Sequence, residues 1–324
     1  MKTSNYISRI SDKLLGILLE SSGAVLVEGA KWCGKTQSSL QVAKSAVYLQ
    51  DPDEGPGYLA MADTKPSLLL EGETPLLLDE WQMAPVIWDA VRFAVDKRAL
   101  MGQFILTGSA TPGDNETIHS GTGRIARMLM RPMSLYESSE SDGKVSLKDL
   151  FDGNKDIAAK NNLTIEQIAH AICRGGWPAA VISGSQSSRI AMNYVDSIIN
   201  SDVHRVDGVE RDPERVRLLL QSLARNISTL ATYKTIMYDM QVNDASITDK
   251  TLSSYLNALR RLFVVEDVPA WQPSLRSRTA IRTANKRQFV DPSIATAALR
   301  TNATGILRDF ETFGFLFESL CTRD

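Results

Sequence analysis

The segment with the clearest capacity for chemistry is an eight-residue loop, Gly29-Ala30-Lys31-Trp32-Cys33-Gly34-Lys35-Thr36. Its spacing is that of a phosphate-binding loop, in which the two glycines let successive backbone N–H groups converge on one anion. We expect Lys35 to neutralise the β- and γ-phosphates of ATP, and the hydroxyl of Thr36 to ligate Mg²⁺. The loop as a whole therefore predicts a site for ATP and Mg²⁺.

The residues on either side of the loop suit this interpretation. Residues 24–27 are aliphatic and partly β-branched, which predicts a buried strand leading into the loop. Residues 37–44 contain no glycine or proline, which favours a helix leading out of it. A helix that begins at the loop would add the positive end of its dipole to the anion site.

A second motif supplies carboxylates. Three leucines, residues 76–78, precede Asp79 and Glu80. We expect a parallel strand that neighbours the loop strand, with its carboxyl end facing the phosphates. Asp79 would hold the metal ion directly or through water, and Glu80 would orient and polarise the attacking water. An Asp-Glu pair alone is more often a solvated strand end, so its significance comes from its pairing with the loop.

Two further segments offer catalytic side chains. Residues 103–106 predict a third strand, followed by the hydroxyls of Thr107 and Ser109. Thr107 is our first candidate for sensing the γ-phosphate or the lytic water, although Thr-Gly-Ser is also an ordinary turn. Beyond a glycine-rich stretch, Arg124 or Arg127 could stabilise transition-state charge, in cis or across a subunit boundary. Arginines in such positions more often serve as surface ion-pair partners.

The order of these features resembles the prokaryotic AAA+-type ATPases that carry a conserved C-terminal domain of unknown function. The segments that carry the resemblance cover essentially the whole chain: residues 6–9, 29–36, 78–82, 106–109, 123–124, 131–135, 175–178, 194–202, 251–271, 289–292 and 314–318. In that family the last of these segments is usually followed by a domain similar to restriction endonucleases. The chain ends at Asp324, so we expect either a fragment or a member that has lost that domain.

The composition bounds the class of protein. The chain has 324 residues, 43% of them hydrophobic, and a formal net charge of −2, which gives no overall attraction to nucleic acid or membrane. Its three cysteines, Cys33, Cys173 and Cys321, are too few and too scattered for a disulfide framework, and its three histidines show no metal-ligand spacing. No apolar run reaches the length of a membrane span. We therefore expect a cytoplasmic protein without a membrane partner.

The pattern predicts an α/β fold with a P-loop NTPase parallel sheet of the AAA+ type, followed by a mainly helical region with a winged helix. We expect a P-loop ATPase domain at residues 1–137, a helical linker at 138–212, a winged-helix domain at 213–291, and the start of a truncated C-terminal domain at 292–324. The third helix of the winged helix has an apolar stripe at Leu252, Tyr255, Leu256, Leu259, Leu262 and Phe263. Strands near 263–265 and 268–271 would form the wing.

The sequence says less about the binding partners of this protein than about its nucleotide site. The winged helix and residues 276–287, which contain five basic residues and no acid, suit either nucleic acid or a protein partner, and an arginine acting in trans would require a homo-oligomer. Two functions remain open. One is Mg²⁺-dependent ATP hydrolysis coupled to a conformational change that acts on nucleic acid or protein. The other is a nucleotide-gated binding module with little turnover, and Glu80 favours the first because a switch without hydrolysis needs no catalytic carboxylate.

Overall fold

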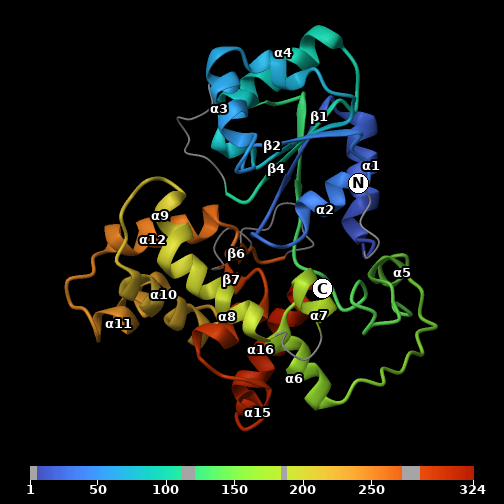
Figure 1. Ribbon diagram of the computed structural model, residues 1–324. Helices are drawn as coiled ribbons and strands as arrows, with labels where there is room; N and C mark the ends of the chain where they lie inside the picture. Colours follow the sequence, from blue (N-terminus) through green and yellow to red (C-terminus); the bar gives the residue numbers. More distant parts are fainter. Residues whose placement is uncertain (1–5, 111–120, 184–187, 272–284) are drawn as a thin grey trace.

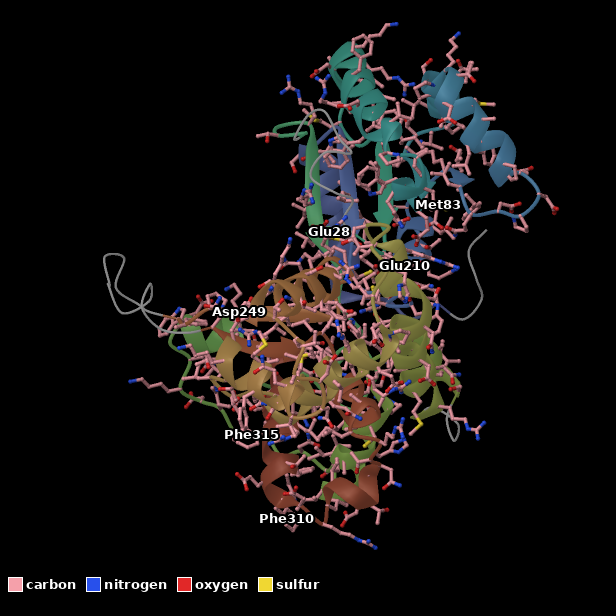
Figure 2. All side chains as sticks on the ribbon, turned by 90° about the vertical axis from the view of Figure 1, so that its left-hand side faces the viewer. Glu28, Met83, Glu210, Asp249, Phe310 and Phe315 are labelled. Carbon is pink, nitrogen blue, oxygen red and sulfur yellow. The ribbon has the colours of Figure 1, made fainter. Side chains whose placement is uncertain are left out.

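The computed structural model describes residues 6–110, 121–183, 188–271 and 285–324. The chain folds into an α/β part, built around a parallel sheet, and a mainly helical part below it (Figure 1). The carboxyl edge of the sheet faces the helical part. Figure 2 shows Glu28, which ends β1, and Met83, which follows β3, at the end of the α/β part that is turned toward the helices.

All five strands of the sheet are parallel and have the order β2-β3-β4-β1-β5. Their bounds are β1 Ala24–Glu28, β2 Ser45–Tyr48, β3 Leu76–Asp79, β4 Phe104–Gly108 and β5 Ile125–Leu129. Ala24 of β1 pairs in register with Phe104 on one side and Ile125 on the other. The three central strands are mainly apolar, as expected for strands that are buried on both faces.

The predicted strands before the loop, before the carboxylates and before Thr107 are confirmed, but the predicted neighbour relation is wrong. We expected the strand of Asp79 beside the loop strand, and the structure places β4 between them. Sequence order does not fix lateral order in a parallel sheet, because crossover connections can pass over an intervening position. As a result, the carboxyl ends of β1, β4 and β3 meet in a row.

Helices cover both faces of the sheet. Alternate strand residues face opposite sides, so Leu26, Leu78 and Leu106 belong to one hydrophobic core, and Val27, Leu77 and Ile105 to another. The helices of this part are α1 Ile10–Ser21, α2 Lys35–Leu40, α3 Gly55–Thr64, η1 Pro66–Leu70, η2 Trp81–Met83 and α4 Val86–Arg98. The helix predicted over 37–44 is α2, which begins at Lys35 and already ends at Leu40.

The helical part continues the core that includes Val27. Its first half contains α5 Leu147–Phe151, α6 Ile165–Arg174, α7 Pro178–Ser183, α8 Ser188–Ser197, η4 Ile198–Asp202 and α9 Val203–Arg205. The segment η4 is a turn of π-helix that continues α8. Its C-terminal elements, α14 Pro292–Ala298, α15 Ala303–Ile306 and α16 Phe310–Arg323, bury Ile294, Leu316 and Leu320 in that same core.

Residues 213–291 contain three helices and then a ribbon, in the predicted order. The elements are α10 Pro213–Arg225, α11 Tyr233–Gln241, α12 Asp249–Arg261, β6 Val265–Val268 and β7 Lys286–Phe289, and the two strands are antiparallel. Four residues of the predicted stripe, Leu252, Tyr255, Leu256 and Leu259, are buried on α12. The helix ends at Arg261, so the buried Leu262 and the half-buried Phe263 lie beyond it. The second strand is later than predicted, because β6 pairs with 286–289, and residues 272–284 between them lie outside the described residues. The winged-helix assignment stays a prediction.

No helix in the described parts of the chain has the length and hydrophobicity needed to cross a membrane.

Candidate functional site

The phosphate-binding loop connects β1 to α2 at the carboxyl edge of the sheet. Gly29 and Gly34 have φ angles of 151° and 107°, which few residues other than glycine adopt. A Cβ on Gly29 would also lie 2.1 Å from the carbonyl oxygen of Met130. The ammonium of Lys35 is buried inside the loop and donates hydrogen bonds of 2.9 Å to the carbonyls of Gly29 and Ala30. The loop therefore holds a cation at its centre.

Asp79 is the point where three elements converge. One of its carboxylate oxygens, Oδ1, accepts hydrogen bonds from the hydroxyls of Thr36, at 2.7 Å, and Thr107, at 2.6 Å. The other, Oδ2, accepts a hydrogen bond of 2.7 Å from the side-chain amide of Gln50, which lies after β2. The Asp79 carboxylate is fully buried and is oriented from α2, β4 and the β2 loop at once.

Glu80 lies next to this carboxylate in a strained backbone conformation. Its φ angle is +58°, which is uncommon for a residue with a side chain and often marks a functional site. Its carboxylate accepts a hydrogen bond of 2.8 Å from Ser109 and a further one from the Gln82 amide. The Oε1 atom of Gln82 is buried and, among the described residues, accepts no hydrogen bond. Glu80 is thus fixed beside an unsatisfied polar atom.

The donor set at this edge fits a nucleotide with Mg²⁺. The metal prefers oxygen ligands and in such sites takes only one or two from carboxylates, the rest coming from water and phosphate. Thr36 and Asp79 present a hydroxyl and a carboxylate oxygen 2.7 Å apart, close to the cationic Lys35 loop. Within the described residues no group of three or more His, Cys, Asp or Glu side chains is placed to hold a metal by itself.

Thr107 and Arg124 have positions different from those we expected. The Thr107 hydroxyl is fully buried between Asp79 and the Glu80 N–H, which donates to it at 3.2 Å, so it contacts both residues of the carboxylate pair. Arg124 directly precedes β5 and accepts a hydrogen bond from the Ala24 N–H with its carbonyl. It therefore lies at the amino edge of the sheet, a full strand length from the loop, and pairs with Asp96. The catalytic role predicted for Arg124 stays a prediction, and in this structure its side chain is paired with Asp96 at the edge of the sheet opposite the loop.

The other candidate arginine, Arg127, also pairs with a nearby acidic residue. Its guanidinium pairs with Glu28 at 3.1 Å and lies over the ring of Trp88. Burial raises the pKa of the Glu28 carboxyl, and the charge of Arg127 opposes that shift. Arg127 therefore acts in this structure as a partner for a half-buried acid on β1.

Comparison with known proteins agrees with the geometry. Residues 21–139 match the family model described as an AAA domain, which spans the sheet, the loop and both carboxylates. Residues 21–139 thus have the P-loop NTPase fold and are similar to the AAA domain. Residues 165–305 match a second model, described as a domain of unknown function, DUF8612.

Most of the chain is also similar to known proteins at low sequence identity. The chain is 23% identical over 271 residues to uncharacterized proteins of Mycobacterium tuberculosis and Mycobacterium bovis, covering 80% of this chain and 53% of each relative. The chain thus spans about half the length of the curated relatives it matches. Among solved structures it is similar to a Walker-type ATPase of Pyrococcus abyssi, with 16% identity, a TM-score of 0.54, and coverage of 92% of this chain and 97% of the other. That similarity supports the fold.

The tip of the loop joins the α/β part to the helical part. The ammonium of Lys31 pairs with Asp202 of η4 at 3.2 Å, and the ring of Trp32 lies 5.8 Å from that of Tyr194 on α8. On the inner side of the loop, the buried guanidinium of Arg9 donates to the Cys33 carbonyl at 2.8 Å. The loop is therefore held both by the α/β part and by the helices that follow it.

Sequence reasoning missed three polar residues of this site: Gln50, Gln82 and Arg9. Gln82 and Arg9 fall in segments that carry the family resemblance, and that was the only signal available for them. The sequence around Gln50 carries no signal of its role, because that role depends on β2 lying next to β3.

The basic residues considered for nucleic acid are largely paired within the chain. On α12, Arg260 pairs with Asp267 at 2.7 Å, and Arg261 donates to the Val206 carbonyl. In the basic stretch 276–287, Lys286 pairs with Glu318 and Arg287 with Asp267, while residues 276–284 lie outside the described residues. The described part of this face carries little unpaired positive charge.

Proposed function

We propose that this protein hydrolyses ATP with Mg²⁺ and uses the state of the phosphate-binding loop to change the helical part. The observation that carries the proposal is Asp79, whose Oδ1 joins Thr36 of the loop helix to Thr107 of β4, with Glu80 as the next residue. Phosphoryl transfer depends mainly on positioning and on neutralising charge, and these residues supply both.

Each side chain has a distinct task in this proposal. Lys35 supplies positive charge to the β- and γ-phosphates, and Thr36 and Asp79 hold Mg²⁺, which when bound neutralises phosphate charge. Glu80 orients the attacking water and accepts its proton. Ser109 and Gln82 keep the Glu80 carboxylate in one orientation. Arginine assistance, if supplied by Arg124, would come from a second copy of the chain, since its own loop is out of reach.

The coupling between nucleotide binding and the helical part follows from the contacts of the loop tip. A nucleotide that reorders the loop changes the positions of Lys31 and Trp32, and so acts on Asp202 and Tyr194. For the target of that change we favour a protein over nucleic acid, because the two arginines of α12 are paired within the chain. A nucleotide-gated module with little turnover would use the same contacts and differs only in not needing Glu80.

The test is steady-state hydrolysis of ATP with Mg²⁺ by the wild type and by Glu80→Gln, with ATP affinity measured in parallel. We expect Glu80→Gln to bind ATP normally. Its turnover should fall at least about 100-fold, since general-base removal typically costs 10²–10⁴-fold. Glu71→Gln makes the same chemical change at an exposed position and should match the wild type. Unchanged turnover in Glu80→Gln would refute the role of Glu80.

Two further measurements separate the alternatives. Lys35→Ala should abolish detectable ATP affinity, and retained affinity would remove the phosphate-loop assignment. Adding double-stranded DNA at low and moderate salt tests nucleic acid as the partner, because stimulation that fades with salt is typical of phosphate contacts. Hydrolysis indifferent to DNA supports a protein partner. Tight ATP binding by the wild type without turnover would favour the nucleotide-gated module.

A further inference from the structure

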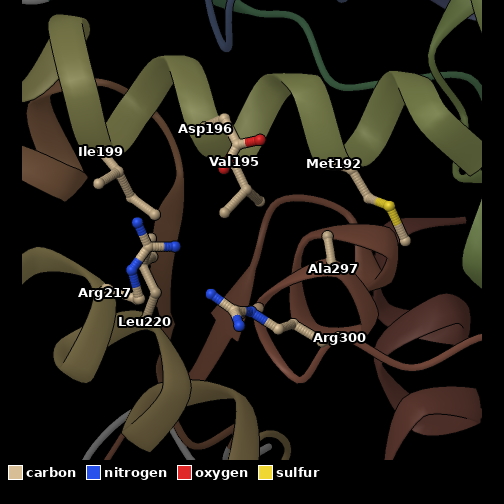
Figure 3. Close-up of a pocket in the computed structure, with 9 residues that line it drawn as sticks. Met192, Val195, Asp196, Ile199, Arg217, Leu220, Ala297 and Arg300 are labelled. Carbon is tan, nitrogen blue, oxygen red and sulfur yellow. The ribbon is translucent and has the colours of Figure 1, made fainter. Parts of the chain in front are cut away.

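A cavity of about 350 Å³ opens in the helical part, away from the phosphate-binding loop. It lies between α8 with η4, the helix α10, and the end of α14 (Figure 3). Val195, Ile199 and Leu220 form apolar walls, and the polar side chains are Arg217, Arg300 and Asp196. Its volume is in the range of sites for small organic molecules, which typically combine apolar walls with a few polar groups.

The two arginines come from different elements and face the same space. Figure 3 shows the guanidinium groups of Arg217 and Arg300 in the same space beneath α8. Arg217 has one weak contact, 3.4 Å from its Nε to the exposed Glu214, and Arg300 has no ion pair within the described residues. Two like charges in one cavity repel each other unless an anion lies between them. With Asp196 as the single acid, the lining keeps one net positive charge.

Arg300 is an exposed residue at a position where glycine is the usual choice. It directly follows the end of α14 with a φ angle of +52°. Its N–H bonds to the Ala297 carbonyl and the Thr301 N–H to the Thr296 carbonyl, which is the Schellman pattern of a helix end. Glycine is strongly preferred at this position because it adopts the left-handed region without strain. The chain instead accepts strain and directs a guanidinium into the cavity, and such outliers cluster at ligand sites.

We propose that this cavity binds a small organic anion, a phosphate monoester or a carboxylate with an apolar body. Guanidinium groups donate paired hydrogen bonds to both kinds of anion, and two of them from α10 and α14 can clamp one group from opposite sides. The apolar body lies against Val195, Ile199 and Leu220. Asp196, on the α8 wall, accepts a hydrogen bond from a hydroxyl or amine of the ligand.

The experiment must exclude binding at the phosphate loop. Phenyl phosphate and phenylacetate are titrated calorimetrically into the Lys35→Ala protein, and also into the wild type saturated with ADP and Mg²⁺. We expect saturable binding of at least one probe in both settings. Arg217→Ala and Arg300→Gly should each weaken it about tenfold or more, the usual effect of losing a charge-assisted contact. Arg308→Ala changes an exposed arginine outside the lining and should leave affinity unchanged.

Arg300→Gly also separates binding from folding. Because glycine suits the left-handed position, this variant should unfold at a higher urea concentration than the wild type while it binds the probe more weakly. Binding of phenyl phosphate alone identifies a phosphate site and of phenylacetate alone a carboxylate site, and both support the proposal. Absence of binding by both probes, or binding that survives both arginine substitutions, would overturn it. None of these outcomes depends on ATP hydrolysis.

Discussion

The ammonium of Lys31 lies 3.2 Å from Oδ1 of Asp202, so the phosphate-binding loop makes an ion pair with the π-helical turn of the helical part. The second oxygen of Asp202 accepts a hydrogen bond of 3.1 Å from Ser197. Turns of π-helix are uncommon and often mark functional positions. This pair therefore connects the loop that would contact ATP to the π-helical turn η4.

The first prediction concerns that connection. In the wild type, ATP with Mg²⁺ should change amide hydrogen exchange over residues 198–205, because nucleotide binding reorders the loop that contacts Asp202. Asp202→Asn keeps the shape and removes the charge, so the exchange difference should shrink while ATP affinity changes little. Stability should fall by less than about 1 kcal/mol, since Lys31 is 41% exposed.

Asp156→Asn provides the control, because it removes the same charge from an exposed position of the helical part. It should show the wild-type exchange difference. If Asp202→Asn also retains the full difference, the ion pair does not transmit the state of the loop.

The second prediction concerns Thr107. Thr107→Val keeps the shape of the side chain but removes the hydroxyl that donates to Asp79 and accepts from the Glu80 N–H. Because the site is fully buried, we expect a loss of about 1–3 kcal/mol in the free energy of unfolding and slower ATP turnover. Thr107→Ser retains the hydroxyl and should recover most of the lost stability and most of the lost turnover. Urea unfolding and steady-state kinetics measure the two effects, and a fully active Thr107→Val protein would contradict the positioning role.

The local parts of the site could be predicted from the sequence. The phosphate loop and the Asp79-Glu80 pair depend on spacing within short segments, and the aliphatic runs before them identify buried strands without any knowledge of the fold. The apolar stripe of α12 was predictable for the same reason, because its period is set by the helix itself.

The features that the sequence did not reveal depend on the lateral arrangement of the strands and on contacts between elements. Arg124 precedes its strand and Asp79 ends its own, so the two lie at opposite edges of a parallel sheet, and this follows only once β5 is known to be parallel. Gln50 reaches Asp79 because β2 is adjacent to β3. Likewise, helical periodicity places Arg260 on the polar face of α12 but does not reveal that Asp267 already pairs with it.

The third prediction concerns a buried ion pair in the helical part. Arg323 of α16 lies 2.9 Å from Asp291, and their side chains are 1% and 0% exposed. Arg323→Ala leaves the Asp291 carboxylate buried with only the N–H groups of Gly176 and Ser293 as donors. Loss of one partner from a buried pair costs about 3–5 kcal/mol in the free energy of unfolding. The double variant with Asp291→Asn should recover part of that loss.

Urea unfolding measures this cost, with Arg308→Ala as the matched change at an exposed arginine. A cost for Arg323→Ala no larger than that of the control would show that the pair is not needed to hold α16 on the segment around Gly176.

The fourth prediction concerns acid stability. Two hydrogen bonds of 2.7 Å from the buried Arg211 guanidinium lower the pKa of the Asp207 carboxyl below its usual range. Because the folded state binds this proton less readily than the unfolded chain, the contribution is complete above a pH of about 3.9, the ordinary aspartate pKa. It is lost as the pH falls further, through the pKa of the folded state. Asp207→Asn should therefore be less stable than the wild type at pH 6, with a gap that narrows toward pH 3.

Urea unfolding at several values of pH between 6 and 3 measures that gap. Asp63→Asn, at an exposed position of α3, should leave a small difference that does not vary in this way. A constant gap for Asp207→Asn would mean that the contact with Arg211 stabilises the protein through its geometry and not through the charge of Asp207. The pH dependence is the deciding observation, because loss of a bidentate hydrogen-bonded contact alone would lower stability equally at each pH.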